Sequence, residues 1–204
     1  MNNIKIGIID YGVGNQQSIQ NCLKSIGFKS KITCEISILD ECQIILLPGV
    51  GAFSPSINQI KIKKIDKYLI DRAKTNTPII GICLGMQLLA KTSSENGLFE
   101  GLNLIPGKVE NLTKDNKFHI GWNSLKVIKE NNIFVDEKED FYFNHSYAFK
   151  ELEDYSICST KYGDIEFNSI IRKNNIIGLQ FHPEKSQQEG KIFLFNLIKN
   201  LCDA

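Results

Sequence analysis

The chain has 204 residues, of which 42% are hydrophobic and 23% are charged. This length and composition fit one α/β domain with a substantial apolar core, and we expect residues 1–204 to form a single domain. The 24 Lys and Arg residues nearly balance the 23 Asp and Glu residues, giving a formal charge of +1. That balance argues against a polyanionic partner such as nucleic acid or a membrane surface.

No apolar run approaches the roughly 18 to 20 residues that a membrane span requires. Residues 1–5 read as the start of a strand rather than as a signal peptide, so we expect a cytoplasmic location. The six cysteines and three histidines are too scattered for a local zinc pattern, and we expect no metal or other cofactor. Any chemistry must therefore use side chains that the fold brings together.

The first half alternates apolar strands with helical stretches. Apolar residues recur at helical spacing from Ile19 to Ile26 and from Ile65 to Ala73. Strand-like runs lie at residues 4–10, 29–33, 44–47 and 78–82. Buried strands that lack alternation and are separated by helices indicate a parallel sheet covered on both faces.

The second half contains strand-like runs with turn residues between them. These runs lie at residues 118–120, 125–128, 141–143, 155–159, 165–172 and 176–181. A last helix is expected from residue 190 to about residue 201, where apolar residues return at helical spacing. No linker, repeat or low-complexity segment divides the chain.

The sharpest local signal is Gly81-Ile82-Cys83-Leu84-Gly85, which follows an apolar strand and precedes a helical stretch. This spacing is typical of a nucleophile elbow, a strained turn whose flanking glycines avoid collisions with the neighbouring strand and helix. The partial positive charge of the helix N-terminus would favour the Cys83 thiolate. The alternative is a buried strand cysteine without chemistry, and the two glycines favour the elbow.

A thiol nucleophile needs a base, and the base needs a group that orients it. His182 closes an apolar strand, Pro183 ends that strand, and Glu184 follows two residues after the histidine. Alone, this sequence would read as a surface turn. Together with the elbow it predicts a Cys83-His182-Glu184 triad.

Acyl transfer also needs hydrogen-bond donors for an oxyanion. The Pro48-Gly49-Val50-Gly51 turn follows a buried strand and allows close backbone approach, and the N–H of Leu84 would be a second donor. Gln87, four residues after Cys83, would project from the same helix face toward a substrate. The alternatives are an ordinary turn and an exposed helix glutamine.

Six motifs in order carry an end-to-end resemblance to a known family. They are residues 10–15 (DYGVGN), 47–53 (LPGVGAF), 81–89 (GICLGMQLL), 119–123 (HIGWN), 142–147 (YFNHSY) and 178–186 (GLQFHPEKS). With these motifs the chain resembles the class I, triad-type glutamine amidotransferases, and within them the HisH-type glutaminase subunits of imidazole glycerol phosphate synthase. The resemblance implies an α/β, flavodoxin-like fold with a mostly parallel central sheet, helices on both faces and antiparallel strands added in the C-terminal half.

The resemblance also implies roles for individual residues. Cys83 would form a γ-glutamyl thioester, His182 would act as general base and acid, and Glu184 would orient His182. Glutamine would be hydrolysed to glutamate and ammonia. The oxyanion strand and glutamine pocket would comprise Gly49, Val50, Gly51, Leu84, Gln87, His145, Ser146 and Tyr147.

Ammonia released into water at neutral pH would be protonated and lost, so such a protein should dock onto a synthase that receives it. The resemblance implies a HisF-type (β/α)₈ cyclase of histidine and purine-intermediate biosynthesis as that partner. Asn15, Trp122, Tyr142 and Lys185 fall where the family's interface and gate lie. Trp122 could equally be a core aromatic residue.

Three departures from the family pattern concern the partner rather than the triad. Phe118 stands where the family commonly has proline, Asn144 replaces a small apolar residue, and Gln16-Gln17 follows the Asn15 loop. These departures leave a paralogue open, one that supplies ammonia to a sugar amidotransferase in surface-polysaccharide biosynthesis.

Two other classes of function fit less well. A dinucleotide-binding module would use the glycines of Gly12-Val13-Gly14, but Gln17 occupies the position of the third glycine. A non-catalytic scaffold would have lost part of the triad, whereas Cys83, His182 and Glu184 are all present.

Overall fold

The computed structural model describes residues 4–113, 118–129, 133 and 135–202. The strand start expected at residues 1–5 therefore lies partly outside the described residues. The described helices are α1 (Gln16–Ser25), α2 (Ile36–Leu39), α3 (Phe53–Ile62), α4 (Ile65–Ala73), α5 (Leu84–Leu88), the 3₁₀ turn η1 (Pro183–Lys185) and α6 (Gln187–Cys202). Within the described residues, no helix is long and apolar enough to cross a membrane.

The central sheet is mixed, as expected. Its order is β2-β1-β3-β4-β14-β13-β12-β9, with bounds β1 (Lys5–Ile9), β2 (Lys29–Thr33), β3 (Ile44–Leu47), β4 (Ile79–Ile82), β9 (Lys126–Val127), β12 (Ser156–Tyr162), β13 (Ile165–Lys173) and β14 (Ile176–Leu179). The strands from β2 to β14 pair in parallel, and those from β14 to β9 pair antiparallel. The predicted combination of a parallel first half and antiparallel additions is thus confirmed.

Two smaller sheets complete the second half. β8 (His119–Ser124) and β10 (Asp140–His145) form an antiparallel pair. The other sheet has the order β11-β7-β5-β6, with bounds β5 (Thr92–Ser93), β6 (Phe99–Glu100), β7 (Gly107–Asn111) and β11 (Tyr147–Glu151). The sequence analysis missed this four-stranded sheet because its strands are short and have no sustained alternation.

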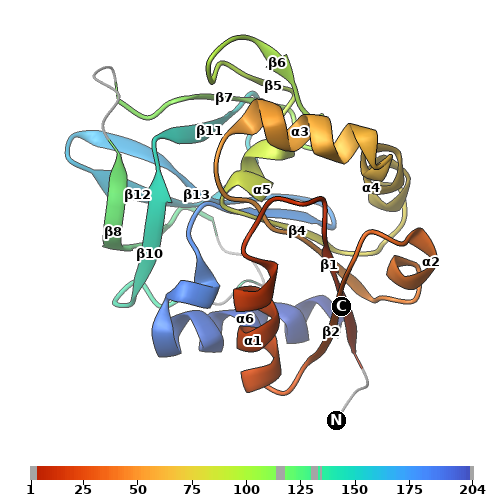
Figure 1. Ribbon diagram of the computed structural model, residues 1–204. Helices are drawn as coiled ribbons and strands as arrows, with labels where there is room; N and C mark the ends of the chain where they lie inside the picture. Colours follow the sequence, from red (N-terminus) through yellow and green to blue (C-terminus); the bar gives the residue numbers. More distant parts are fainter. Residues whose placement is uncertain (1–3, 114–117, 130–132, 134, 203–204) are drawn as a thin grey trace.

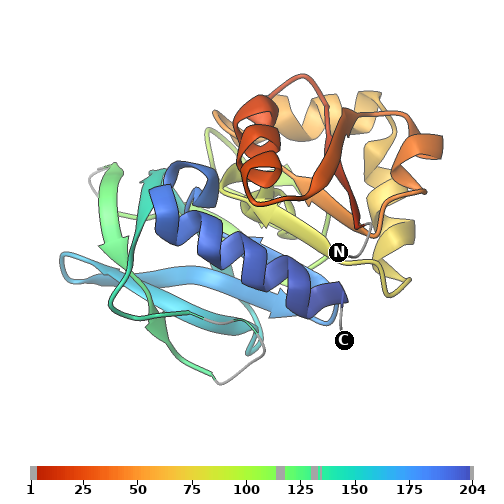
Figure 2. The ribbon, with the colours of Figure 1, turned by 90° about the horizontal axis from the view of Figure 1, so that it is seen from below.

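Helices cover both faces of the central sheet and enclose two apolar clusters. On one face, α1 and α6 pack Leu23 and Leu197 against strand residues such as Ile8. On the other face, α3, α4 and α5 contribute residues such as Ile57 and Leu69 (Figure 1). Seen from below, α6 runs along the strands of the C-terminal half (Figure 2). The fully apolar strands of the first half follow from this double coverage.

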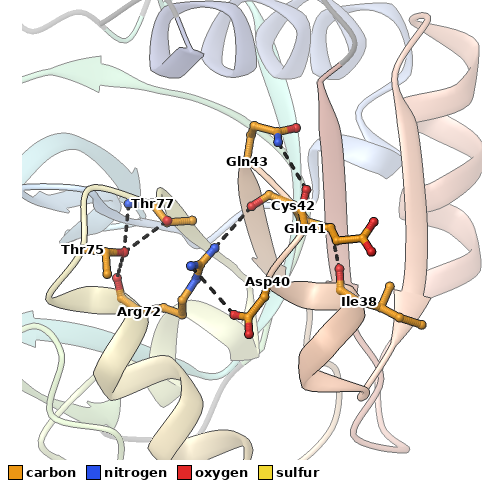
Figure 3. A network of polar contacts seen from close by, with 8 residues as sticks. All are labelled: Ile38, Asp40, Glu41, Cys42, Gln43, Arg72, Thr75 and Thr77. Carbon is orange, nitrogen blue, oxygen red and sulfur yellow. Dashed lines mark hydrogen bonds and ion pairs between the residues drawn. The ribbon is translucent and has the colours of Figure 1, made fainter.

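One polar cluster ties α4 to the segment between α2 and β3 (Figure 3). Arg72 donates from Nη2 to the carbonyl of Cys42 at 3.4 Å, and its Nη1 lies 3.8 Å from Asp40 Oδ1. The hydroxyl of Thr75 donates to the Arg72 carbonyl at 2.7 Å. Cys42 precedes β3, so this cluster stabilises the end of the sheet opposite the carboxyl ends of the parallel strands.

Candidate active site

Three neighbouring parallel strands end together and bring distant motifs to one edge of the sheet. Strand β4 lies between β3 and β14, with Gly81 level with Leu47 on one side and with Gly178 on the other. The N–H of Cys83 donates to the Leu179 carbonyl at 2.7 Å, which joins the elbow directly to the strand that leads to His182. In open α/β sheets, ligands bind outside the carboxyl ends of strands.

The turn at Cys83 has the strained geometry that the sequence predicts. Cys83 has φ of 54° and ψ of −111°, in a region that residues with side chains rarely adopt. A Cβ atom at Gly85 would lie 1.8 Å from the Leu47 carbonyl oxygen, and one at Gly81 would lie 2.6 Å from the Gly85 oxygen. Both flanking glycines are therefore sterically required.

Cys83, His182 and Glu184 lie together. The imidazole of His182 is 1% exposed, and its Nδ1 lies 2.7 Å from Glu184 Oε1. Burial by itself would lower the pKa of His182, but the hydrogen bond and charge of Cys83, together with Glu184, outweigh burial and raise this pKa to about 10. The arrangement supports a thiolate and imidazolium pair whose imidazole is oriented by a carboxylate.

Asn15 contacts the Glu184 carboxylate in addition to its expected place at a partner interface. Its side-chain Nδ2 donates to Glu184 Oε1, the same oxygen that His182 contacts. The sequence analysis placed Asn15 at a partner interface, and the structure adds a contact with the predicted triad. The neighbouring Tyr11 is fully buried and donates its hydroxyl to the Pro48 carbonyl at 2.8 Å. Residues 10–15 thus hold both Glu184 and the turn that begins at Pro48.

A cavity of about 610 Å³ opens beside the Cys83 thiol. Nine of the residues singled out in the sequence line it: Val50, Gly51, Cys83, Leu84, Gln87, His145, Ser146, Tyr147 and His182. Gly49 does not line the cavity but packs against the start of α5, where a Cβ atom would lie 2.7 Å from the Gly85 nitrogen. The two departures Phe118 and Asn144 also line the cavity.

Buried polar groups in the wall of this cavity form a hydrogen-bonded series. Gln87 donates from Nε2 to the Tyr147 carbonyl at 2.8 Å. The same carbonyl oxygen lies 2.9 Å from His145 Nδ1, and His145 Nε2 lies 3.2 Å from His119 Nδ1. Burial lowers the pKa of His145 to about 3 and that of His119 to about 4. Both imidazoles are therefore neutral at pH 7, which suits a hydrogen-bonding rather than an ionic role.

Two residues of the site, Glu95 and Gln180, were not expected from the sequence. Glu95 lines the cavity, accepts a hydrogen bond from the Phe53 N–H at 2.8 Å, and has a pKa raised by burial. Gln180 is fully buried with its Nε2 3.9 Å from the Cys83 sulfur. A polar residue within the apolar run before His182 was an available signal for Gln180. Glu95 lies in the loop between the two-residue strands β5 and β6, and its sequence surroundings gave no such signal.

The residues expected at an interface or gate lie on the β8–β10 pair and on η1. Trp122 is 45% exposed, pairs with Tyr142 in the strand register, and has its ring 5.9 Å from the Tyr142 ring. Lys185 Nζ lies 5.8 Å from the centre of the Tyr142 ring. Trp122 is thus not a core aromatic residue. The Tyr142 carbonyl accepts a hydrogen bond from the His182 N–H at 2.8 Å, so this surface is continuous with the triad.

The part of the chain that the structure describes holds no group of three or more His, Cys, Asp and Glu side chains that could bind a metal ion. The chemistry that the site supports is nucleophilic attack by a thiolate on a small substrate in the adjacent cavity, with a buried imidazole for proton transfer.

Comparison with known proteins agrees with this geometry. The family model for class I glutamine amidotransferases matches residues 7–201. The subunit HisH of imidazole glycerol phosphate synthase from Carboxydothermus hydrogenoformans is 40% identical over 193 residues, which are 93% of this chain and 96% of that relative. Subunit HisH 2 of the same enzyme from Vibrio vulnificus is 41% identical, covering 92% of this chain and 90% of the relative.

A solved structure shares the fold at lower sequence identity. A glutamine amidotransferase from Thermotoga maritima whose structure has been solved is 16% identical, with a TM-score of 0.68, over 100% of this chain and 100% of that one. The chain therefore belongs to the class I glutamine amidotransferases. Within that class it belongs to the HisH family.

Proposed function

We propose that the protein is the glutaminase subunit of an imidazole glycerol phosphate synthase, and that it hydrolyses L-glutamine to glutamate and ammonia through Cys83. The observation that carries this proposal is the contact of Cys83 with His182 and of His182 with Glu184 in a chain of the HisH family. The family membership supplies the substrate class, and the geometry supplies the residues.

The first half-reaction forms a thioester. The Cys83 thiolate attacks the γ-carbonyl carbon of glutamine, and a tetrahedral intermediate forms. His182 then gives its proton to the departing nitrogen as the carbon–nitrogen bond breaks, which releases ammonia and leaves a γ-glutamyl thioester. The raised pKa of His182 keeps this proton available at neutral pH.

The second half-reaction hydrolyses the thioester. Neutral His182 takes a proton from a water molecule, whose oxygen attacks the thioester carbon. The carbon–sulfur bond breaks, so glutamate leaves and the Cys83 thiolate returns with a protonated His182. Glu184 keeps the imidazole in one orientation through its contact with Nδ1.

The oxyanion of each tetrahedral intermediate requires backbone donors. Leu84 is the first residue of α5, and N–H groups in the first turn of a helix have no acceptor within that helix. Val50 and Gly51 also line the cavity, next to Gly49, which packs against Leu84, and they would supply the second donor. By the resemblance, the Gly49–Gly51 backbone completes this oxyanion hole only when the partner is bound.

The cavity offers complementary groups for the rest of glutamine. Gln87 would accept a hydrogen bond from the carboxamide, and Ser146 and Tyr147 would provide donors for the α-carboxylate. Glu95 would pair with the α-ammonium group, and that cation would favour the ionised carboxylate against the effect of its burial. His145 would hold the Tyr147 backbone in place.

The partner that we propose is a HisF-type (β/α)₈ cyclase. Ile120 and Trp122 expose apolar side chains on β8 at 61% and 45%, next to Tyr142 and Lys185. Exposed aromatic side chains of this kind favour a protein interface. Docking there would place the cyclase beside the triad, so that ammonia passes to it without entering water. Asn15 would connect such docking to Glu184.

We assign the reaction to the cytoplasm. Cys34 is a free thiol that is exposed at the surface. A catalytic thiolate together with an exposed free thiol is compatible with a reducing compartment.

The test is glutamine turnover by the chain mixed separately with a HisF-type barrel and with a sugar amidotransferase from the same organism, each with its acceptor. We expect the barrel to raise the rate of glutamine hydrolysis. The chain alone should be slow, because an incomplete oxyanion hole loses about 3 kcal/mol of transition-state stabilisation. The two HisH relatives carry the synthase name, which favours the barrel over the polysaccharide enzyme. Activation by the sugar system alone would contradict the assignment to imidazole glycerol phosphate synthase. Fast turnover by the chain that neither partner changes would contradict the proposed dependence of glutamine hydrolysis on a partner.

A further inference from the structure

Gln180 lies between the two parts of the site that act on the scissile group. It follows β14, its side chain is fully buried, and its Nε2 lies 3.9 Å from the Cys83 sulfur. Its Oε1 accepts a hydrogen bond from Gln87 Nε2 at 3.3 Å. No role was expected for this residue, and the reaction described above does not use it.

The direction of these hydrogen bonds is fixed by a backbone carbonyl. The Tyr147 carbonyl can only accept, so the amide group of Gln87 must turn its NH₂ end toward it. The second hydrogen of that NH₂ group is donated to Gln180 Oε1, which in turn directs the NH₂ group of Gln180 toward the Cys83 sulfur. Each amide hydrogen in this series has one acceptor, and reversing any one amide would place two like ends together.

Two chemical consequences follow from this direction. Both hydrogens of Gln87 are engaged, so the atom that Gln87 can offer to the cavity is its Oε1, an acceptor. An acceptor at that place selects a substrate group that donates, such as a carboxamide NH₂, over an ester. At the other end, an N–H aimed at sulfur stabilises the thiolate over the thiol, whereas the protonated thiol would donate to the Asn144 carbonyl at 3.8 Å.

We propose that Gln180 is a positioning residue that gives Gln87 its acceptor role toward the substrate amide and directs an N–H toward the Cys83 thiolate. The substrate part rests on the proposed glutaminase function, and the thiolate part does not. Both parts rest on the series of hydrogen bonds that runs from the Tyr147 carbonyl through Gln87 and Gln180 to the Cys83 sulfur.

The test compares the wild-type chain with Gln180→Met, which has a similar length but neither donor nor acceptor. The first readout is the pH midpoint of Cys83 alkylation by iodoacetamide, followed in the isolated chain by mass spectrometry of the Cys83 peptide. The second is the ratio of kcat/KM for glutamine to kcat/KM for γ-glutamyl methyl ester, measured with the activating synthase. We expect the midpoint to rise and the ratio to fall about fivefold.

Two further variants separate positioning from general structural damage. Gln180→Glu keeps an acceptor for Gln87 but places an ionised carboxylate near the sulfur, so we expect it to retain most of the ratio while raising the alkylation midpoint further. Ser169→Ala is the matched control, because Ser169 is fully buried on the adjoining strand and the structure gives its hydroxyl no partner among the described residues. The control should change neither readout.

An unchanged midpoint or an unchanged ratio in Gln180→Met would overturn the proposal. Wild-type chain that does not turn over glutamine with any synthase would instead overturn the proposed function, and the alkylation midpoints would still decide the role of Gln180 toward Cys83.

Discussion

The parallel and the antiparallel regions of the molecule bury their strands differently. Strands β3 and β4 are buried at every residue, whereas β8 and β10 alternate between less and more exposed side chains. The parallel region therefore holds the elbow of Cys83 in a packed frame, and the antiparallel region presents Trp122 to the outside. The elbow and the proposed partner surface therefore have separate structural supports, which meet at His182 through its hydrogen bond to the Tyr142 carbonyl.

The largest expected effect is the loss of glutamine hydrolysis when the thiol at the elbow of the parallel region is removed. Cys83→Ala should reduce glutamine hydrolysis by about three orders of magnitude or more, because no other nucleophile occupies the elbow. Folding and binding of the synthase should be unchanged. The measurement is glutamate release with the activating synthase, with circular dichroism and the binding constant as controls. Retained turnover would show that the thiolate is not the nucleophile.

A glycine in each region tests the difference in packing. Gly85→Ala would place a Cβ atom 1.8 Å from the Leu47 carbonyl oxygen, and we expect it to lower the free energy of unfolding by about 3 kcal/mol. Gly163→Ala, in the turn between β12 and β13, has no atom near its Cβ but a φ of 60°, so we expect a loss of about 1 kcal/mol. Urea unfolding curves of both variants provide the test. Equal losses would contradict the proposed difference.

The exposed face of the antiparallel region should control binding without controlling stability. Trp122→Ala should weaken binding of the activating synthase by about 2 kcal/mol, or roughly 30-fold in Kd, as removal of a central aromatic side chain from an interface does. The free energy of unfolding should change by less than about 0.5 kcal/mol. Leu152→Ala, another exposed apolar residue of the same half at 62% exposure, is the control and should leave Kd unchanged.

The pH dependence of kcat tests the contact between His182 and Glu184, where the two regions meet. Because the pKa of this imidazole is raised to about 10, its proton is present below that pH and lost above it. We therefore expect kcat for thioester formation to fall above about pH 10, by about tenfold per pH unit. Glu184→Gln removes a group that raises this pKa, so the fall should begin at lower pH. An alkaline limb that does not move in Glu184→Gln would contradict the assigned contact.

The smallest expected effect is on the free energy of unfolding in acid, which should depend on the buried His119 of the antiparallel region. The pKa of His119 is lowered to about 4 by burial, so the unfolded chain binds a proton below about pH 6.5 that the folded chain does not. The resulting stability is complete above pH 6.5 and is lost as the pH falls toward 4. His119→Phe should reduce the loss of unfolding free energy between pH 7 and pH 5.5 by about 1 kcal/mol. Urea midpoints at the two pH values measure it.

Much of the parallel region could be predicted because its signals are local. The apolar runs, the two glycines around Cys83 and the His182-Pro183-Glu184 sequence each specify a short-range structure that neighbouring residues enforce. The α3 helix was not predicted, since Pro55 interrupts its pattern, although proline is tolerated in the first turn.

The sequence by itself determined the fold class, the elbow and the family to which the chain belongs. Only the tertiary structure decided that Asn15 contacts Glu184, that Glu95 lines the cavity and that Gln180 faces Cys83. Those contacts join residues as far apart as 169 positions, as for Asn15 and Glu184. No local propensity encodes such a pair, because the pair exists only when β1, which leads to Asn15, and β14, which leads to Glu184, end at the same edge of one sheet.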